Sequence, residues 1–302
     1  MAHDVPRYKI GTARVDGDDR VAVAIDGGAI LGIDRPGPNH EPPPADMRSV
    51  LSDWTTWSPR LDAIAAGEWA ATEIPGDPDW QLGRLGDKCL CIGANYTDHI
   101  DEMDVPKPPW PYSFVVPPST ALVLSGQPVA VPRGVKQWDW EAEVGVILGR
   151  RVRYASTAEA AEAVALYTPF NDLSARDVGL VRIAFGNDMT MVKAHDDSKV
   201  IGPVFTPARF VPDPQNLKLR CIVNGDMKQD LTTRSMIYSV AECVAHLSTI
   251  MTLEPGDVIA TGTGGGVGVM HNPPQTLHDG DVVVVEVDGI GRTETPIVEP
   301  DA

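Results

Sequence analysis

Two glutamates one residue apart, Glu141 and Glu143, precede an apolar, β-branched stretch that runs to Leu148. The stretch predicts a buried strand, and residues i and i+2 of a strand point to the same face. Two carboxylates so close together raise each other's pKa unless a cation lies between them, and a hard divalent ion bound through oxygen would be such a cation. The pair alone favours the simpler alternative, an exposed edge strand with two glutamates on its polar face.

A third carboxylate, Asp172, follows Asn171 in a segment that we expect to form a turn after a helix. An isolated Asn-Asp pair is typical of an Asx turn or a helix N-cap. Combined with Glu141 and Glu143, Asp172 completes a set of three oxygen ligands. Up to three octahedral positions then remain for water or substrate, as in a catalytic Mg²⁺ site.

His99 and Glu102 have the spacing that places two side chains on one face of a helical turn. A carboxylate beside an imidazole raises its basicity and fixes its tautomer, which suits a base that activates water. Taken alone, the segment favours an exposed acidic helix start with one histidine.

Two further features could bind an anion. Lys193 could orient an anionic substrate or stabilise an oxyanion, although most lysines lie on the surface. A strand predicted over residues 258–261 ends in a glycine-rich run, residues 262–268, where backbone N–H groups can approach a ligand closely. That run lacks the lysine of a P-loop and the βαβ context of a dinucleotide site, so ATP and NAD binding are excluded.

The composition is that of an ordinary globular protein, with 302 residues, of which 43% are hydrophobic and 22% are charged. A formal net charge of −17 argues against nucleic acid and anionic membranes as partners. It does not exclude an anionic substrate, because a metal and a few basic residues can dominate locally. No apolar run reaches the ~18 residues of a membrane span, and the first seven residues lack the apolar core of a signal peptide. We therefore expect a cytoplasmic enzyme.

The cysteines do not form a zinc site. None of the pairs that they form has the spacing of zinc ligands, so we expect buried, reduced thiols. The four cysteines are Cys89, Cys91, Cys221 and Cys243.

Residues 1–75 predict a small β-rich module, with short strands near residues 8–11, 21–25 and 30–33, a hairpin turn at Asp26-Gly27 and a helix over residues 47–67. Residues 76–302 predict a catalytic domain of many strands. Its clearest strands cover residues 90–93, 121–124, 144–148, 217–223, 258–261 and 282–287, and its helices cover residues 157–165 and 239–251. Strands with few helices favour an α+β, mainly β fold, a mixed roll or barrel, over a doubly wound sheet.

In their order along the chain, these features resemble the fumarylacetoacetate hydrolase superfamily over about residues 88–298. The motifs that carry the resemblance are Ile92-Gly93-Ala94-Asn95-Tyr96 with His99 and Glu102, Asp139-Trp140-Glu141-Ala142-Glu143, Asn171-Asp172-Leu173-Ser174-Ala175-Arg176-Asp177, Lys193-Ala194-His195-Asp196, Val223-Asn224-Gly225 with Gln229, and Pro255-Gly256-Asp257-Val258-Ile259-Ala260-Thr261-Gly262-Thr263.

The resemblance implies a mixed β-sandwich roll, a homodimer, and one bound Mg²⁺, with Mn²⁺ or Ca²⁺ as alternatives. It also assigns roles to the residues that match the family's motifs. These are Glu141, Glu143 and Asp172 as metal ligands, His99 and Glu102 as a catalytic dyad on a segment that forms a lid, Lys193 as the catalytic lysine, and Arg176, Thr263, Tyr96 and Gly262 as substrate-binding residues.

The chain departs from the family's pattern at three positions. Val116 stands where many relatives have lysine, Gly179 where many have glutamine, and Gly264 where proline is usual. In relatives the first two positions often help to hold a substrate carboxylate. Their absence favours a bulkier or less charged diketone over a simple acylpyruvate.

Our leading hypothesis is a metal-dependent hydrolase that cleaves a carbon–carbon bond in a 1,3-dicarbonyl compound with water activated by His99 and Glu102. The alternative is an isomerase, decarboxylase or hydratase that acts on a 2-oxo acid through a metal-bound enolate. A third hypothesis is an inactive relative that serves as a binding or scaffold protein.

Overall fold

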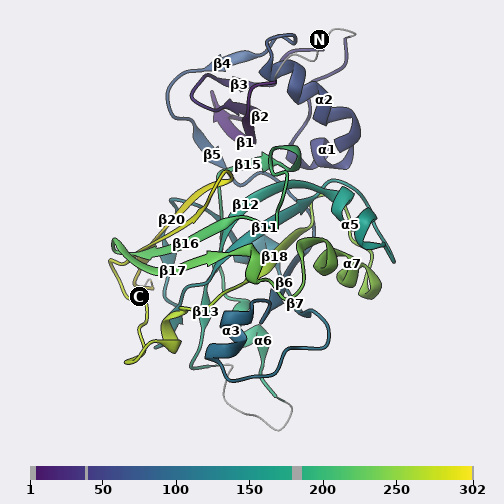
Figure 1. Cartoon of the computed structure of the whole chain (residues 1–302). Helices are drawn as coiled ribbons and strands as arrows, with labels where there is room; N and C mark the ends of the chain where they lie inside the picture. Colours follow the sequence, from purple (N-terminus) through teal and green to yellow (C-terminus); the bar gives the residue numbers. More distant parts are fainter. Residues whose placement is uncertain (1–4, 38–39, 179–185, 301–302) are drawn as a thin grey trace.

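The computed structural model describes residues 5–37, 40–178 and 186–300 (Figure 1). Its N-terminal part contains β1 (Tyr8–Val15), β2 (Asp18–Ile25), β3 (Ile30–Gly32), α1 (Met47–Ser52), α2 (Trp54–Ala65) and β4 (Thr72–Ile74). The expected strands and the turn after β2 are present, and Gly27 adopts a φ of 66° there. The single helix expected over residues 47–67 is two helices, because the backbone of Asp53 leaves the helical region with φ −129° and ψ 48°.

The N-terminal strands continue into the main sheet. Strand β1 pairs antiparallel with β15 (Val204–Pro207), with Ile10 opposite Phe205, and also with β5 (Asp79–Gln81). One hydrophobic cluster includes Tyr8 and Val23 from the N-terminal part and Phe170 and Phe205 from the remainder. The two parts therefore share a sheet and a core, and the domain boundary at residue 75 stays a prediction.

The remainder of the chain is built mainly from strands, as expected. Its elements are β6 (Cys89–Gly93), α3 (Thr97–Glu102), β7 (Tyr112–Val116), α4 (Pro118–Ala121), β8 (Leu122–Leu124), β9 (Val129–Ala130), β10 (Trp138–Asp139), β11 (Ala142–Leu148), α5 (Thr157–Ala163), β12 (Val164–Asp172), β13 (Ser174–Ala175), α6 (Met189–Lys193), β14 (Lys199–Ile201), β16 (Lys218–Val223), β17 (Asp226–Thr232), α7 (Val240–Ile250), β18 (Val258–Thr263), β19 (Val282–Val287) and β20 (Gly291–Val298). Short 3₁₀ helices cover Ala208–Phe210, Thr233–Ser235 and Gly268–Met270.

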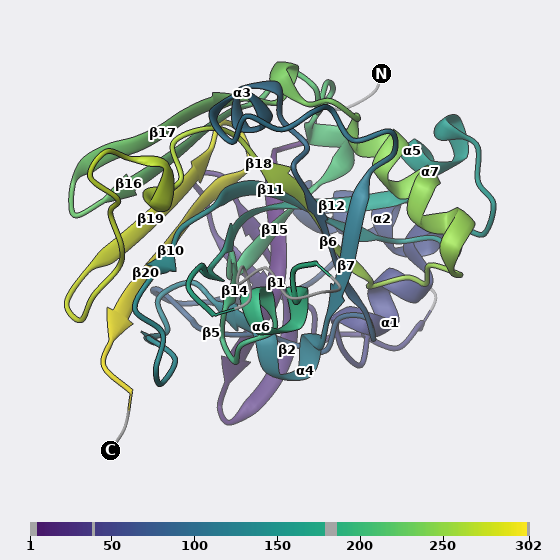
Figure 2. The same cartoon turned by 90° about the horizontal axis from the view of Figure 1, so that it is seen from below.

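Two sheets form the body of the molecule. Within the described residues the larger sheet runs β4-β3-β2-β1-β15-β12-β11-β18-β6-β7, and the smaller runs β17-β16-β19-β20-β9. The smaller sheet lies against β11 and β12, while α5 and α7 pack side by side (Figure 2). Parallel pairs such as β18 with β6 occur among antiparallel ones, which confirms the mixed, mainly β architecture. No helix in the described ranges is long and apolar enough to cross a membrane.

Strands β11 and β12 position the acidic residues. Strand β11 lies between β12 and β18 and is buried along its whole length, so its sequence is an unbroken apolar run after Glu143. Because β11 and β12 are antiparallel, the start of one lies beside the end of the other, with Ala142 opposite Asn171. This pairing brings Glu141, just before β11, close to Asp172, the last residue of β12.

The expectation that Asp172 begins a turn soon after a helix was wrong. Helix α5 ends at Ala163, and the nine residues that follow form strand β12. This strand is buried on both faces and shows no alternation of polar and apolar residues. It also contains Pro169, a residue that argues against a central strand, yet Pro169 is paired opposite Val144.

Candidate metal and active site

Three buried carboxylates meet in the interior. One oxygen from each of Glu141, Glu143 and Asp172 lies within 4.8 Å of the other two, and each of these side chains is almost fully buried. The alternative of an exposed edge strand is therefore wrong, because the glutamates lie at the centre of the larger sheet.

Glu143 has the surroundings of a metal ligand. Its Oε2 accepts a hydrogen bond of 2.7 Å from the backbone N–H of Gly262, but its buried Oε1 has no hydrogen-bond partner. Burial and the charges of Asp172 and Glu141 raise the pKa of Glu143 well above its usual value. A divalent cation at Oε1 would remove this cost, so the three residues fit a hard metal ion.

Glu141 is surrounded by cations instead. Its Oε1 lies 2.6 Å from Nη2 of Arg176, and its Oε2 lies 2.6 Å from Nζ of Lys193. Burial alone would raise the pKa of Glu141, but the charges of Lys193 and Arg176 outweigh it and lower the pKa to about 2. Glu141 is therefore ionised with or without a metal.

Two lysines contact Asp172. Nζ of Lys193 lies 2.7 Å from Oδ2 of Asp172, and Nζ of Lys199 lies 2.7 Å from Oδ1. Both lysines are buried, so Lys193 does not have the surface position that is usual for its type. Lys199 was missed in the sequence; only its place at the start of a short apolar run could have drawn attention to it.

His99 and Glu102 form the expected dyad on α3. Nδ1 of His99 lies 2.6 Å from Oε1 of Glu102, and Oε2 of Glu102 accepts a hydrogen bond of 2.9 Å from the N–H of Gly266. Glu102 thus joins α3 to the glycine-rich segment after β18. Since Glu102 holds Nδ1, Nε2 is the ring nitrogen of His99 that remains to accept a proton.

A cavity of about 210 Å³ lies over this group. Its polar lining comprises His99, Glu141, Asp172, Arg176, Asn187, Lys193 and Thr263, and its other lining residues are Ile92, Gly93, Ala94, Met103, Tyr112, Phe114 and Met189. Of the expected catalytic residues, His99 and Lys193 line the cavity, and Glu102 lies behind His99. Of the acidic cluster, Glu141 and Asp172 line it, and Glu143 lies outside the lining.

Two of the four expected substrate-binding residues line the cavity, and the other two do not. Arg176 lines the cavity and pairs with Asp139, with Nε 3.0 Å from Oδ2. Thr263 lines it too, and its hydroxyl donates to the carbonyl of Ala142 over 2.8 Å. Gly262 donates its N–H to Glu143. Tyr96 is fully buried, outside the cavity lining.

The three departures from the family's pattern have different surroundings. Val116 is buried in β7 opposite Cys89. A Cβ on Gly264 would lie 2.6 Å from the side chain of Leu231, so a larger residue needs a shift there. Gly179 lies outside the described residues.

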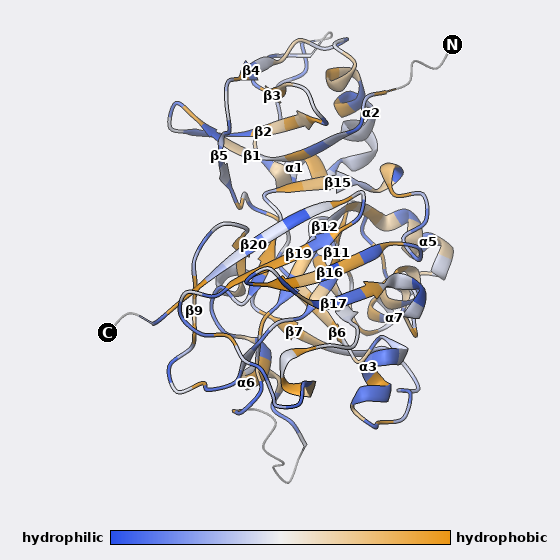
Figure 3. Cartoon of the chain, turned by 60° about the vertical axis from the view of Figure 1, so that its left-hand side comes forward, coloured by the Kyte–Doolittle hydropathy of each residue, from blue (hydrophilic) through white to orange (hydrophobic). Residues whose placement is uncertain are grey.

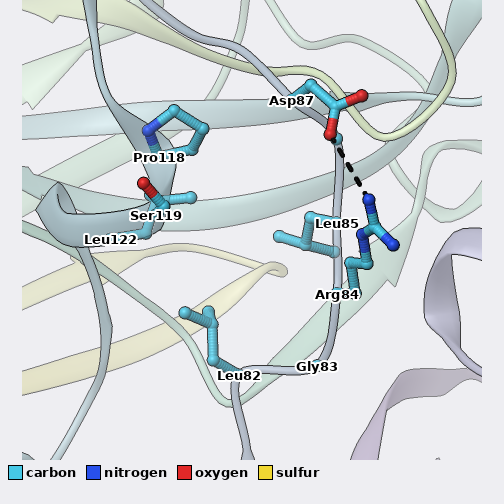
Figure 4. A pocket seen from close by; sticks show the side chains of 9 residues that line it. Leu82, Gly83, Arg84, Leu85, Asp87, Pro118, Ser119 and Leu122 are labelled. Atoms are coloured by element: carbon cyan, nitrogen blue, oxygen red, sulfur yellow. Dashed lines mark ion pairs between the residues drawn. The ribbon is translucent and has the colours of Figure 1, made fainter.

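A second cavity, of about 420 Å³, lies between residues 82–87 and the segment around α4 (Figure 4). Leucine side chains and an exposed pair of charges, Arg84 and Asp87, line it. Its described lining contains no group of converging acids or bases, so the first cavity is the candidate active site.

The chain resembles known proteins both in sequence and in structure. The family model described as "Fumarylacetoacetate (FAA) hydrolase C-terminal" matches residues 88–298. The mitochondrial oxaloacetate tautomerase fahd2 of Xenopus laevis is 37% identical over 212 residues, which cover 70% of this chain and just under two thirds, 66%, of that protein.

Solved structures share the fold. A protein described as a putative HpcE protein from Mycobacterium smegmatis is 28% identical, with a TM-score of 0.80 over 96% of this chain and 99% of its own. Fumarylpyruvate hydrolase from Pseudomonas aeruginosa, solved with Mn²⁺ and pyruvate, is 29% identical, with a TM-score of 0.65 over 75% of this chain and 94% of its own.

Proposed function

The chain belongs to the fumarylacetoacetate hydrolase family, and from this premise we propose that it is a metal-dependent hydrolase that cleaves a carbon–carbon bond in a 1,3-dicarbonyl compound. One observation supports this most strongly. The His99–Glu102 pair, joined over 2.6 Å, and the cluster of three buried carboxylates contribute to one cavity, the pair through His99 and the cluster through Glu141 and Asp172.

Glu141, Glu143 and Asp172 would hold a divalent cation. We propose Mg²⁺, with Mn²⁺ and Ca²⁺ as alternatives, and the Mn²⁺ in the Pseudomonas hydrolase supports a metal of this kind. Bound there, the cation would supply Lewis acidity that polarises the substrate's carbonyl oxygens.

His99 would act as the general base. Glu102 accepts a hydrogen bond from the N–H at Nδ1 of His99. Nε2 of His99 therefore takes a proton from water, and the hydroxide adds to one carbonyl carbon. Lys193, an ammonium group in the cavity wall, would stabilise the negative oxygen that forms. The bond between that carbon and the central carbon then breaks, and its electron pair stays on the central carbon. His99 returns the proton to the central carbon, and the products are one carboxylic acid and one ketone.

A second function, tautomerisation or isomerisation of a 2-oxo acid, is favoured by the name of the Xenopus relative. In this reaction His99 would remove a proton from carbon instead of water, and a proton would return at a different atom. The same side chains serve both reactions, but only hydrolysis breaks the carbon–carbon bond.

Proton NMR in D₂O with Mg²⁺ separates the two functions. A 2,4-dioxo acid should give equal amounts of two products under the hydrolase, whereas a tautomerase should interconvert the keto and enol forms of oxaloacetate and introduce deuterium without cleavage. EDTA and His99→Gln should each suppress the reaction. If the metal binds and neither reaction occurs, the protein is an inactive relative and the proposal is wrong.

A further inference from the structure

The cavity has an apolar side that the proposed reaction does not use. Met103 follows α3, Tyr112 and Phe114 come from β7, and Met189 begins α6. The two rings lie 6.5 Å apart, and Tyr112 is 43% exposed. Apolar side chains that stay in contact with water in a cavity favour a ligand that covers them with apolar surface. We call these four residues the apolar lining.

The charged side chains around the metal site, together with a divalent ion, would compensate the charge of one anion. Four buried carboxylates, those of Asp139, Glu141, Glu143 and Asp172, face three cations. Lys193 and Lys199 are buried, and the side chain of Arg176 is 11% exposed. With all four carboxylates ionised, the net charge of this group is −1, and a divalent ion, which favours the ionised carboxylates, would change it to +1. One substrate carboxylate or enolate would neutralise the remainder, whereas a second would be left without compensation.

Carboxylates lie on or beside the two helices that carry cavity residues. Helix α3, mostly blue in Figure 3, carries Asp98 and Asp101 in addition to Glu102, and Asp188 caps α6. The cations that line the cavity, Arg176 and Lys193, are both paired with carboxylates. Among the described residues of the lining, a negative group at the far end of a substrate would therefore meet no unpaired cation.

On the basis of the proposed function, we propose that the substrate is a 2,4-dioxo acid whose far end carries an aryl or branched alkyl group and no second carboxylate. The dioxo acid end lies at the carboxylates and the dyad. The apolar end covers Met103, Tyr112, Phe114 and Met189, and releases water from them. These four residues determine specificity and do not act on the reacting atoms.

Three ligands with the same 2,4-dioxobutanoate end test this, with a phenyl, a methyl or a carboxyethyl group at the far end. Their dissociation constants are measured by calorimetry in Mg²⁺ on the slow His99→Gln variant, and kcat/KM is measured on the unaltered protein. The phenyl ligand should bind at least ~10-fold more tightly than the carboxyethyl ligand. Equal or tighter binding of the carboxyethyl ligand overturns the inference and leaves the proposed function intact.

A pair of variants tests whether the apolar lining causes the preference for the phenyl ligand. Met189→Lys adds a cation to the apolar lining and should shift the preference by ~10-fold or more toward the carboxyethyl ligand. Met227→Lys, at a position that is 52% exposed on β17 and outside the cavity lining, should leave it unchanged. Identical preferences in the two variants contradict the assignment of the lining. If Mg²⁺ binds but none of the three ligands does, the proposed function itself is wrong.

Discussion

At the scale of single residues, Glu141 and Glu143 are two positions apart and have opposite electrostatic surroundings. Arg176 and Lys193 hold Glu141 as an anion. Glu143 faces other carboxylates and keeps one oxygen without a partner. A role as metal ligand and a role in stability are therefore separable in this pair.

We expect Glu141→Gln to destabilise the metal-free protein by about 3–5 kcal/mol, because the buried Lys193 and the mostly buried Arg176 lose a charged partner. Glu143→Gln should leave the unfolding free energy unchanged or raise it at pH 7, because it removes a buried, unpaired charge. Both variants should lose Mg²⁺ binding in calorimetry. Urea unfolding in EDTA measures the difference, and an equal loss of stability in both variants would contradict this account.

The low pKa of Glu141 also predicts an effect of pH. Its pKa is about 2 in the folded protein and 4.5 in the absence of interactions. The ionised group therefore stabilises the fold above pH 4.5, and this contribution is lost as the pH falls toward 2. The difference in unfolding free energy between the unaltered protein and Glu141→Gln should shrink over this range. A constant difference across the range would be inconsistent with the low pKa.

Lys199 should lower the affinity of the site for the metal. Lys199→Met removes a positive charge 2.7 Å from a ligand oxygen of Asp172, so Mg²⁺ should bind at least several-fold more tightly, while the metal-free protein becomes less stable. Lys218→Met, which removes an exposed pair with Asp230, should change neither quantity measurably. An unchanged Mg²⁺ affinity in Lys199→Met would show that this lysine does not oppose the metal.

The residues of the site differ in how far the sequence could predict them. His99 and Glu102 are one helical turn apart, and Glu141 and Glu143 are two positions apart at the start of a strand, so local spacing predicted that each pair lies on one face. Their burial and their roles came from the resemblance to the family, because spacing alone favoured exposed positions. Lys199 was missed because its contact with Asp172 depends on the pairing of β12 with β14. Such a pairing between distant segments has no local signal.

At the scale of elements, the end of β18 supports the metal site through its backbone. Gly262 has a φ of 94°, in the left-handed region, and its N–H holds Glu143 in place. Strands such as β11, β18 and β19 were evident from apolar runs bounded by turn residues. Strand β12 was not, because burial on both faces and Pro169 concealed it.

We expect Gly262→Ala to destabilise the protein by about 2–4 kcal/mol, since the new Cβ would be strained at this φ and would lie 2.7 Å from Cβ of Asn95. Gly126→Ala is the matched control, with a φ of 89° and no atom within 4 Å of the new Cβ. The unfolding free energy of Gly126→Ala should fall only by the cost of the strained backbone, about 1 kcal/mol. Thermal unfolding compares them, and equal losses would mean that contact with Asn95 is unimportant.

At the scale of the whole molecule, the N-terminal strands and the catalytic sheet form one structure. The family model begins at residue 88, but β1 pairs with β15 and the first hydrophobic cluster includes residues from both parts. The sequence predicted both parts from their composition and turns, but it could not show that they share a sheet. The homodimer and the cytoplasmic location stay predictions.

We predict that residues 76–302 do not fold alone, because removal of β1 exposes the edge of β15 and apolar residues such as Phe205. The full chain should unfold in a single calorimetric transition, and the truncated chain should aggregate or lack a cooperative transition. A truncated chain that melts cooperatively and binds Mg²⁺ would show two independent domains.

The two hydrogen-bonding oxygens of Glu102 have a consequence for the timing of the reaction. One oxygen contacts His99 and the other contacts Gly266, so movement of α3 away from the glycine-rich segment breaks the anchor that orients the carboxylate for His99. The dyad is therefore complete only while α3 stays against this segment. If α3 is the lid that the resemblance to the family implies, the frequency with which it closes would set an upper limit on the rate of turnover.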